Sequence, residues 1–230
     1  MPAAWNQIME TIEYQFQNKD LLVQAFTHSS YANERKINRI QDYERLEFLG
    51  DAVLELITSE ALLTRYPKKH EGELSKLRSS IVCEYCLAQC ARELHYPDYV
   101  YLSKGERQTG GANRDSLLCD LFESVLGAIY LDGGLEPAKR YVERFLLSDI
   151  ENKRLFYDAK THLQELVQKA ELGEIQYVLL DEQGPDHQKH FFVEVDIEGT
   201  RYGAGDGQSR KQAEQKAAYE ALLRLKNEGR

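Results

Sequence analysis

Carboxylates lie among leucines in the segment 43–54 (YERLEFLGDAVL), where a helix would normally bury only hydrocarbon. Glu44, Glu47 and Asp51 recur at helical spacing, so a helix would project all three from one face. Apolar residues fill most of the remaining circumference: Leu46, Leu49, Val53 and Leu54. The pattern predicts a largely buried helix that carries an acidic stripe.

Buried like charges repel one another, and they persist only with raised pKa values, cationic partners or bound metal ions. Arg45 is the only cation in the segment, so the stripe indicates either a metal site or a structural network closed by distant arginines. A second segment, 117–130, favours the metal site because it repeats the pattern with Asp120 and Glu123 in an otherwise apolar helix. Packing the two helices together would converge four carboxylates: Glu47, Asp51, Asp120 and Glu123. Such all-oxygen ligands suit Mg2+, with Mn2+ as a substitute, and disfavour zinc.

At these residues the chain resembles the bacterial ribonuclease III family. The run ERLEFLGD (44–51) matches that family's acidic motif, and DLFE (120–123) matches its second acidic pair. The family commonly has Asn where this chain has Tyr43, a departure outside the acidic set. The resemblance implies a magnesium-dependent endonuclease that hydrolyses double-stranded RNA, leaves 5′-phosphates and short 3′ overhangs, and processes ribosomal RNA precursors and structured messenger RNAs. It places Asp51 and Glu123 closest to the chemistry.

Two other functions fit the sequence less well than the nuclease. A protein that holds double-stranded RNA without cutting it would have no reason to keep four costly carboxylates. A carboxylate-bridged di-iron oxygenase needs Glu-x-x-His pairs, and neither acidic helix has one.

Helical periodicity continues to about Asn152, so the first domain (1–152) is expected to be an all-α endonuclease domain. Pro67 should end the first acidic helix. A single helix is expected from Glu71 to about Leu94, and the polar segments 32–42 and 104–111 read as loops. The second of these loops lacks the Gly-Lys-Ser/Thr ending of a P-loop, so no nucleotide cofactor is expected.

After a short linker (153–157) the periodicity changes to that of strands. A helix, three strands and a helix are expected within 158–227, which is a small α+β domain. Three motifs in that order resemble the double-stranded-RNA-binding domain: KTHLQE (160–165), GPDH (184–187) and SRKQAEQKAA (209–218). Such a domain reads A-form shape through 2′-hydroxyl and phosphate contacts. The expected RNA contacts are Gln164, His187, Arg210, Lys211 and Lys216; Ile175 replaces a usual proline.

A formal net charge of −9 argues at first against a nucleic-acid partner. The distribution of charge matters more than the total, because metal ions would set the local field at an acidic site. RNA contacts then need only local basic patches. The chain has no basic start followed by an apolar run and no stretch of membrane-spanning length, so a cytoplasmic protein without a membrane partner is expected.

Three of the four cysteines cluster at Cys83, Cys86 and Cys90. The Cys-x-x-Cys spacing invites a zinc or redox interpretation, but no second pair follows and Cys119 stands alone. All three fall on one face of the expected helix, which favours reduced core packing.

One acidic set per chain cannot cut both strands of a duplex at neighbouring positions. A homodimer with a two-fold axis would present one site to each strand. Phe48, beside the acidic stripe, is the expected interface residue, because the matching aromatic side chain of the resembling family inserts into the other subunit. The alternative is that Phe48 is an ordinary core residue.

Overall fold

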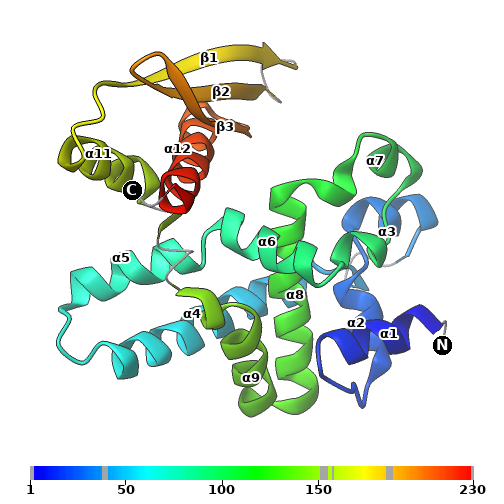
Figure 1. Ribbon diagram of the computed structural model, residues 1–230. Helices are drawn as coiled ribbons and strands as arrows, with labels where there is room; N and C mark the ends of the chain where they lie inside the picture. Colours follow the sequence, from blue (N-terminus) through cyan, green and yellow to red (C-terminus); the bar gives the residue numbers. More distant parts are fainter. Residues whose placement is uncertain (1–2, 38–40, 151–154, 157, 185–188, 229–230) are drawn as a thin grey trace. The chain divides into compact units, whose positions relative to one another are not determined.

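The computed structural model describes residues 3–37, 41–150, 155–156, 158–184 and 189–228 (Figure 1). The chain divides into two compact units, Met1–Ile150 and Glu151–Arg230. Among the described residues, no helix is both long and apolar enough to cross a membrane.

In its described part, the first unit is built from helices, as expected. Short 3-10 turns at Tyr96–Asp98, Gly111–Asn113 and Leu147–Asp149 join some of them. The α-helices are α1 (Ala3–Thr11), α2 (Lys19–Ala25), α3 (Ser29–Arg35), α4 (Glu44–Arg65), α5 (Glu71–Ile81), α6 (Glu84–Glu93), α7 (Lys104–Gln108), α8 (Asp115–Gly133) and α9 (Leu135–Phe145).

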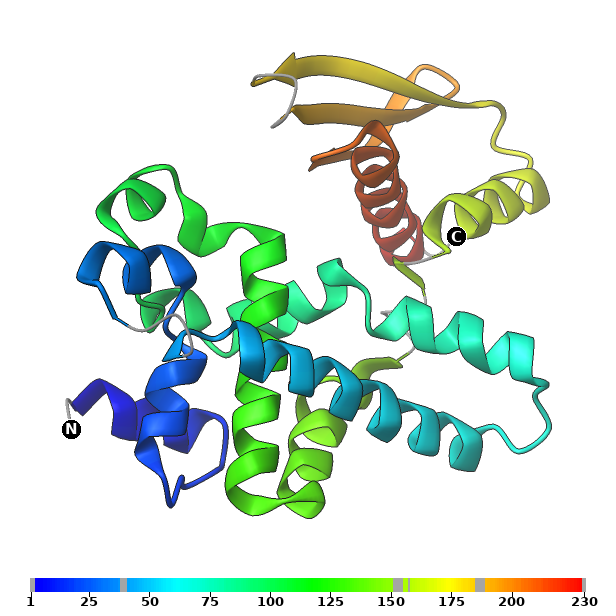
Figure 2. The same ribbon diagram turned by 180° about the vertical axis from the view of Figure 1, so that it is seen from behind.

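The second acidic segment forms α8, the central helix of this unit. Its apolar residues are buried nearly all round, because α2, α4, α6 and α9 all pack against it. Figures 1 and 2 show α4 crossing α8 in both views. This largely buried helix carries Asp120 and Glu123, which are themselves only partly buried.

The first acidic segment forms α4. At its start, Oδ1 of Asp42 accepts a hydrogen bond from the Glu44 amide over 3.2 Å, which satisfies one of the free amides of the first turn. The helix ends at Arg65, with Tyr66 as its C-cap and Pro67 next, so the expected end is confirmed.

The prediction of a single helix from Glu71 to Leu94 is wrong, because the helical conformation is interrupted between α5 and α6. Cys83 is extended, with φ −76° and ψ 151°, and acts as the N-cap of α6. The hydroxyl of Ser80 donates to the Leu77 carbonyl over 2.7 Å, a local bond that competes with continuation of the helix. Apolar periodicity alone did not reveal this break.

Two expected loops also contain helix. The segment 104–111 includes α7, which begins where the Ser103 hydroxyl accepts the Glu106 amide over 3.2 Å. The segment 32–42 includes the end of α3, which closes at Lys36 in the left-handed conformation with φ 55°. Both helices are only one or two turns long, so their periodicity is too short to detect.

The second unit has the expected order of helix, three strands and helix: α11 (Ala159–Lys169), β1 (Ile175–Gln183), β2 (His190–Ile197), β3 (Thr200–Gly207) and α12 (Arg210–Asn227). The sheet is antiparallel in the order β1-β2-β3. Both helices lie on one face of the sheet (Figure 1). Val195 and Ile197 of β2 are buried in the same cluster as Ala217 and Ala221 of α12.

Candidate functional site

Two glycines let α4 and α8 meet backbone to backbone. A Cβ atom on Gly50 would lie 1.8 Å from the carbonyl oxygen of Glu123, and one on Gly127 would lie 2.1 Å from that of Leu46. No other residue type fits at either position without moving a helix. Since Glu47 and Glu123 lie about one turn from these glycines on their helices, the close crossing draws their side chains together.

The expected acidic residues interact electrostatically at this crossing. Burial raises the pKa of Glu123 to about 8, and the charges of Asp51, Glu47 and Asp120 add to that effect. The pKa of Glu47 rises to about 7 for the same reasons, burial first and then the charge of Asp120. Burial likewise raises the pKa of Asp120. The like charges at this site therefore oppose the simultaneous ionisation of all its carboxyl groups.

The four residues are not equally close. Asp120 and Glu123 offer oxygens that lie within 4.8 Å of one another and of the Cys119 sulfur. Glu47 is partly buried and Asp51 is exposed on α4, and both act on this group through their charges. Asp120 and Glu123 are therefore the close pair of the expected set, and Glu47 and Asp51 lie near enough for their charges to raise the pKa of Glu123.

Cys119 was not expected at the site, because one cysteine in an apolar helix carries no distinctive pattern. Its thiol makes a long contact of 3.9 Å with Oε1 of Glu123. Burial and the charge of Glu123 raise its pKa far above the ordinary value, so the sulfur stays protonated. A sulfur ligand suits soft metals, whereas carboxylate oxygens suit hard cations such as Mg2+.

Tyr43 also belongs to the site, although the sequence placed it outside the acidic set. Its hydroxyl donates a hydrogen bond to Oδ2 of Asp120 over 3.0 Å, and this bond offsets part of the rise in the Asp120 pKa. The backbone amide of Tyr43 donates to the Thr27 carbonyl over 2.9 Å, and its ring lies 5.5 Å from that of His28. Tyr43 is therefore a fixed support for one oxygen of Asp120.

The arginine-closed network is not what the structure shows. Among the described residues, none of the four expected ligands forms an ion pair with a lysine or arginine. Arg114 lowers the pKa of Asp120, but its guanidinium pairs with Glu106 at 2.8 Å. The carboxylate oxygens of these residues are of the kind that a hard divalent ion prefers.

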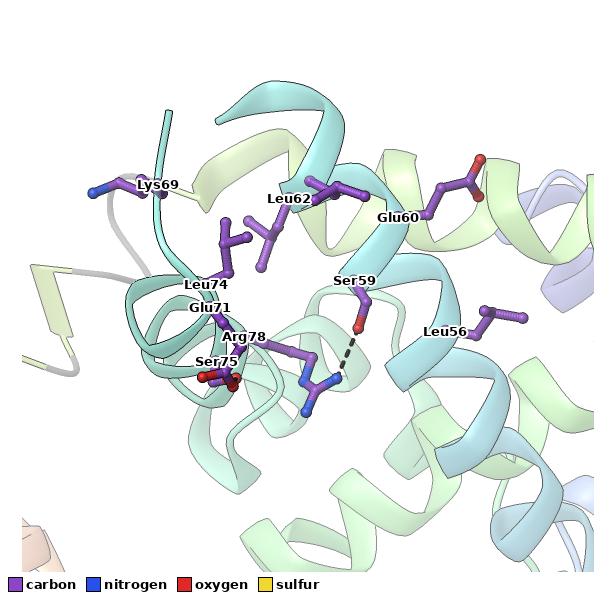
Figure 3. A pocket seen from close by; sticks show the side chains of 10 residues that line it. Leu56, Ser59, Glu60, Leu62, Lys69, Glu71, Leu74, Ser75 and Arg78 are labelled. Carbon is purple, nitrogen blue, oxygen red and sulfur yellow. Dashed lines mark hydrogen bonds between the residues drawn. The ribbon is translucent and has the colours of Figure 1, made fainter. Parts of the chain in front are cut away.

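A row of exposed apolar side chains runs along α4. Phe48 is 81% exposed, so it is not a core residue of its own chain, and Leu56 and Leu63 are 57% and 64% exposed. Leu56 and Leu63 also line a groove between α4 and α5. Leu74 of α5 lines the same groove, and Figure 3 labels it together with Leu56. Across the groove, Nη1 of Arg78 donates to the Ser59 hydroxyl over 2.8 Å. We call Phe48, Leu56 and Leu63 the α4 apolar row.

In the second unit, those expected RNA-binding residues that the structure describes lie on two helices. Gln164 is exposed on α11 and borders a hollow that Lys160 and Tyr177 also line. Arg210 and Lys211 are exposed in the first turn of α12, where helix amides and the helix dipole favour phosphate.

Some of these cations already have partners. Arg210 pairs with Glu214 at 2.9 Å, and Lys216, on the same helix, lies 3.8 Å from Asp206. The Arg210 side chain is mostly exposed, whereas that of Glu214 is mostly buried and also pairs with Lys160. His187 lies outside the described residues.

An acidic helical unit followed by an α-β-β-β-α unit with a basic helix start defines a nuclease with its own RNA-binding module. Residues 18–150 match the family model described as Ribonuclease-III-like, and residues 159–225 match the double-stranded RNA binding motif. The chain belongs to the ribonuclease III family. It is therefore an endoribonuclease that acts on double-stranded RNA, and not a binding protein that leaves its substrate uncut.

Relatives and solved structures agree with this assignment. Ribonuclease 3 of Halalkalibacterium halodurans is 47% identical over 223 residues, which cover 96% of this chain and 85% of that protein. Ribonuclease 3 of Listeria innocua is 45% identical and covers 96% of this chain and 97% of that protein. A crystal structure of the nuclease domain of Campylobacter jejuni ribonuclease III is 36% identical with TM-score 0.59, covering 66% of this chain and 98% of that one. A second structure of that domain has a TM-score of 0.56 and 38% identity, and it covers 60% of this chain and 96% of that one. That structure is described as showing structural flexibility in a region involved in dimer formation.

Proposed function

We propose that Glu47, Asp51, Asp120 and Glu123 together bind Mg2+, with Mn2+ as a substitute, and that Asp51 and Glu123 lie closest to the scissile phosphodiester. One observation carries the proposal. Glu47 and Glu123 are partly buried beside like charges and have raised pKa values, and no described lysine or arginine pairs with either. A divalent cation would hold these carboxylates ionised and remove their repulsion.

The bound ion would activate a water molecule and stabilise the departing 3′-oxygen. The chain's own residues prepare the site for it. The Tyr43 hydroxyl holds Oδ2 of Asp120, so Oδ1 would be the oxygen that Asp120 offers to the ion. The Gly50 and Gly127 crossing fixes the distance between the acidic faces of α4 and α8. Such support for metal ligands sets both affinity and orientation.

We infer an endonuclease domain at 1–152, a linker at 153–157 and an RNA-binding domain at 158–227. The separation of the chain into compact units near residue 150 supports this division. In the RNA-binding domain, Gln164, His187, Arg210, Lys211 and Lys216 would contact the sugar and phosphate groups of A-form duplex, without reading base sequence.

The proposal includes a homodimer, since one site per chain serves one strand. Phe48 at 81% exposure and the other exposed residues of the α4 apolar row support an interface on this face of α4. Two-fold pairing would place one acidic set on each strand of the duplex. The products would carry 5′-phosphates and short 3′ overhangs, from ribosomal RNA precursors and structured messenger RNAs in the cytoplasm.

The test is cleavage of a long RNA duplex by the purified protein, with Mg2+ or with EDTA. Cleavage to short fragments should require Mg2+, whereas duplex binding should survive EDTA because the RNA-binding domain needs no metal. Glu123→Gln keeps the side-chain shape and removes the charge, so turnover should fall more than about 100-fold while binding persists. Glu10→Gln, an exposed change on α1, is the control and should cut normally. Undiminished cleavage in EDTA would exclude the metal site, and normal turnover of Glu123→Gln would remove that residue from it.

A further inference from the structure

At the junction between α5 and α6, two cysteine thiols contact the same backbone carbonyl oxygen. The Cys83 sulfur donates to the Ser80 carbonyl oxygen at 3.6 Å, and the Cys86 sulfur contacts the same oxygen at 3.5 Å. Ser80 is in the last turn of α5, so its carbonyl is one of those that the helix itself leaves unpaired. The shared acceptor fixes both sulfurs on the same side of the junction.

The backbone places these two cysteines at a spacing that a disulfide can bridge. Cys83 is the extended N-cap of α6, and Cys86 is the third residue of the helix. An N-cap side chain turns toward the third helical residue, which is the basis of capping boxes. Residues at this spacing also have the Cα separation that a disulfide requires.

The remaining cysteines have different surroundings. Cys90 is buried and its sulfur donates to the Phe145 carbonyl at 3.1 Å. Cys119 is held protonated by burial. Core packing, the expectation from the sequence, describes Cys86 and Cys90, but Cys83 lies outside the helix and is partly exposed.

The surroundings of Cys83 also favour its thiolate form, which is the form that attacks a disulfide. The hydrogen bond from the Cys86 thiol is the largest influence and lowers the pKa of Cys83 to about 7, and amides of the first turn of α6 add to it against the effect of burial. A thiol of this pKa is substantially ionised at neutral pH, and the thiolate is the reactive form.

We propose that Cys83 and Cys86 form a reversible dithiol–disulfide site whose oxidant is a small-molecule disulfide. The Cys83 thiolate attacks one sulfur of the oxidant, forms a mixed disulfide and releases one small thiolate. Cys86 loses its proton to solvent and attacks the Cys83 sulfur, which breaks the mixed bond and releases the second small thiol. Two protein thiols are thereby oxidised to one disulfide, and the oxidant is reduced to two thiols.

The test uses the reduced full-length protein in native buffer with oxidised glutathione. Its mass should fall by about 2 Da as two hydrogens are lost, and dithiothreitol should restore it. A protease that cuts after Glu84 separates Cys83, in fragment 74–84, from Cys86 and Cys90, in fragment 85–93. These fragments should stay linked after oxidation of the wild-type, Cys90→Ser and Cys119→Ser proteins, and should separate in Cys83→Ser and Cys86→Ser.

A second readout does not depend on the disulfide. Limiting iodoacetamide at pH 7 should modify Cys83 more than about 10-fold faster than Cys119. The proposal fails if native protein forms no link, or if Cys90→Ser or Cys119→Ser abolishes it. It also fails if the purified protein retains zinc that Cys83→Ser loses, since the pair would then be a thiolate metal site.

Discussion

The Tyr43 hydroxyl donates a hydrogen bond to Oδ2 of Asp120 over 3.0 Å, between residues 77 positions apart in the sequence. The bond joins the start of α4 to the acidic face of α8. It orients a carboxylate of the proposed metal set, and it occupies one of the two oxygens that Asp120 could offer a metal ion.

Tyr43→Phe should therefore weaken metal binding without removing a ligand. We expect Mg2+ or Mn2+ affinity, measured by calorimetry in the absence of RNA, to fall by about 10-fold or more. Tyr14→Phe is the matched control, because Tyr14 donates to Oδ2 of Asp132 over 2.7 Å outside the acidic set. Both variants should lose stability, by about 1 to 3 kcal/mol. Equal metal affinities in the two variants would limit Tyr43 to a structural role.

Gly127→Ala should disrupt the helix crossing. The added Cβ would lie 2.1 Å from the Leu46 carbonyl oxygen, so α4 and α8 must separate. We expect a loss of about 3 kcal/mol in the free energy of unfolding, measured by urea titration, and a parallel loss of metal affinity. Gly72→Ala is the control, since a Cβ there has no atom within 4 Å and alanine favours helix. Similar stabilities of the two variants would contradict the close crossing.

The metal-free protein should lose stability as the pH rises. Folding raises the pKa of Glu47 to about 7 and of Glu123 to about 8 from an ordinary value of 4.5. Their stabilising contribution is complete below the ordinary value and is lost as the pH rises through 7 and 8, because the folded state binds more protons than the unfolded state. The melting temperature of wild type in EDTA should fall more between pH 5.5 and 8.5 than that of the Glu47→Gln, Glu123→Gln double variant.

Added Mg2+ should raise the wild-type melting temperature more at pH 8.5 than at pH 5.5, since the ion binds the ionised carboxylates. Identical pH profiles of the wild-type and double-variant proteins in EDTA would show that these two carboxylates do not control the effect.

Phe48→Ala should weaken the dimer while leaving each chain folded. Phe48 is 81% exposed in the single chain, so its removal leaves no cavity there. At an interface, loss of a buried aromatic anchor costs about 2 kcal/mol or more, which is roughly a 30-fold weaker association. Sedimentation at micromolar concentrations should show the wild-type dimer shifting toward monomer in Phe48→Ala. The control is Leu131→Ala, at a 54% exposed position of α8, which should remain dimeric. A monomeric wild-type protein that still makes double-strand cuts would exclude the two-fold arrangement.

The start of α12 should bind phosphate without reading sequence. Replacing Arg210 and Lys211 by alanine should weaken binding to all RNA duplexes alike and reduce the salt dependence by about one unit of slope for each lost phosphate contact. Binding measured in EDTA keeps the assay free of cleavage. Arg224→Ala, at the other end of α12 and paired with Glu228 at 3.0 Å, is the control. A loss confined to certain sequences would indicate base readout instead.

Periodic and local features were predictable from the sequence because neighbouring residues determine them. Carboxylates spaced along α4 and α8 indicated their shared face, Pro67 indicated the end of α4, and alternation in 191–197 indicated β2. The division between helical and mixed units followed from the change in period from 3.6 to 2 residues. These signals also identified the acidic set.

Contacts between distant segments could not be predicted in this way, because no local period encodes which side chains meet. The hydrogen bond from Tyr43 to Asp120 depends on how α4 crosses α8. The contact of Cys119 with Glu123 lies within α8, but the burial of this pair depends on the helices packed around α8. The break before Cys83 depends on hydrogen bonds that compete with helix continuation and on packing of α6 against α8. The sequence by itself determined which residues carry charge and which helices bury them; only the tertiary structure decided their partners, because burial and repulsion act through space between segments that the chain keeps far apart.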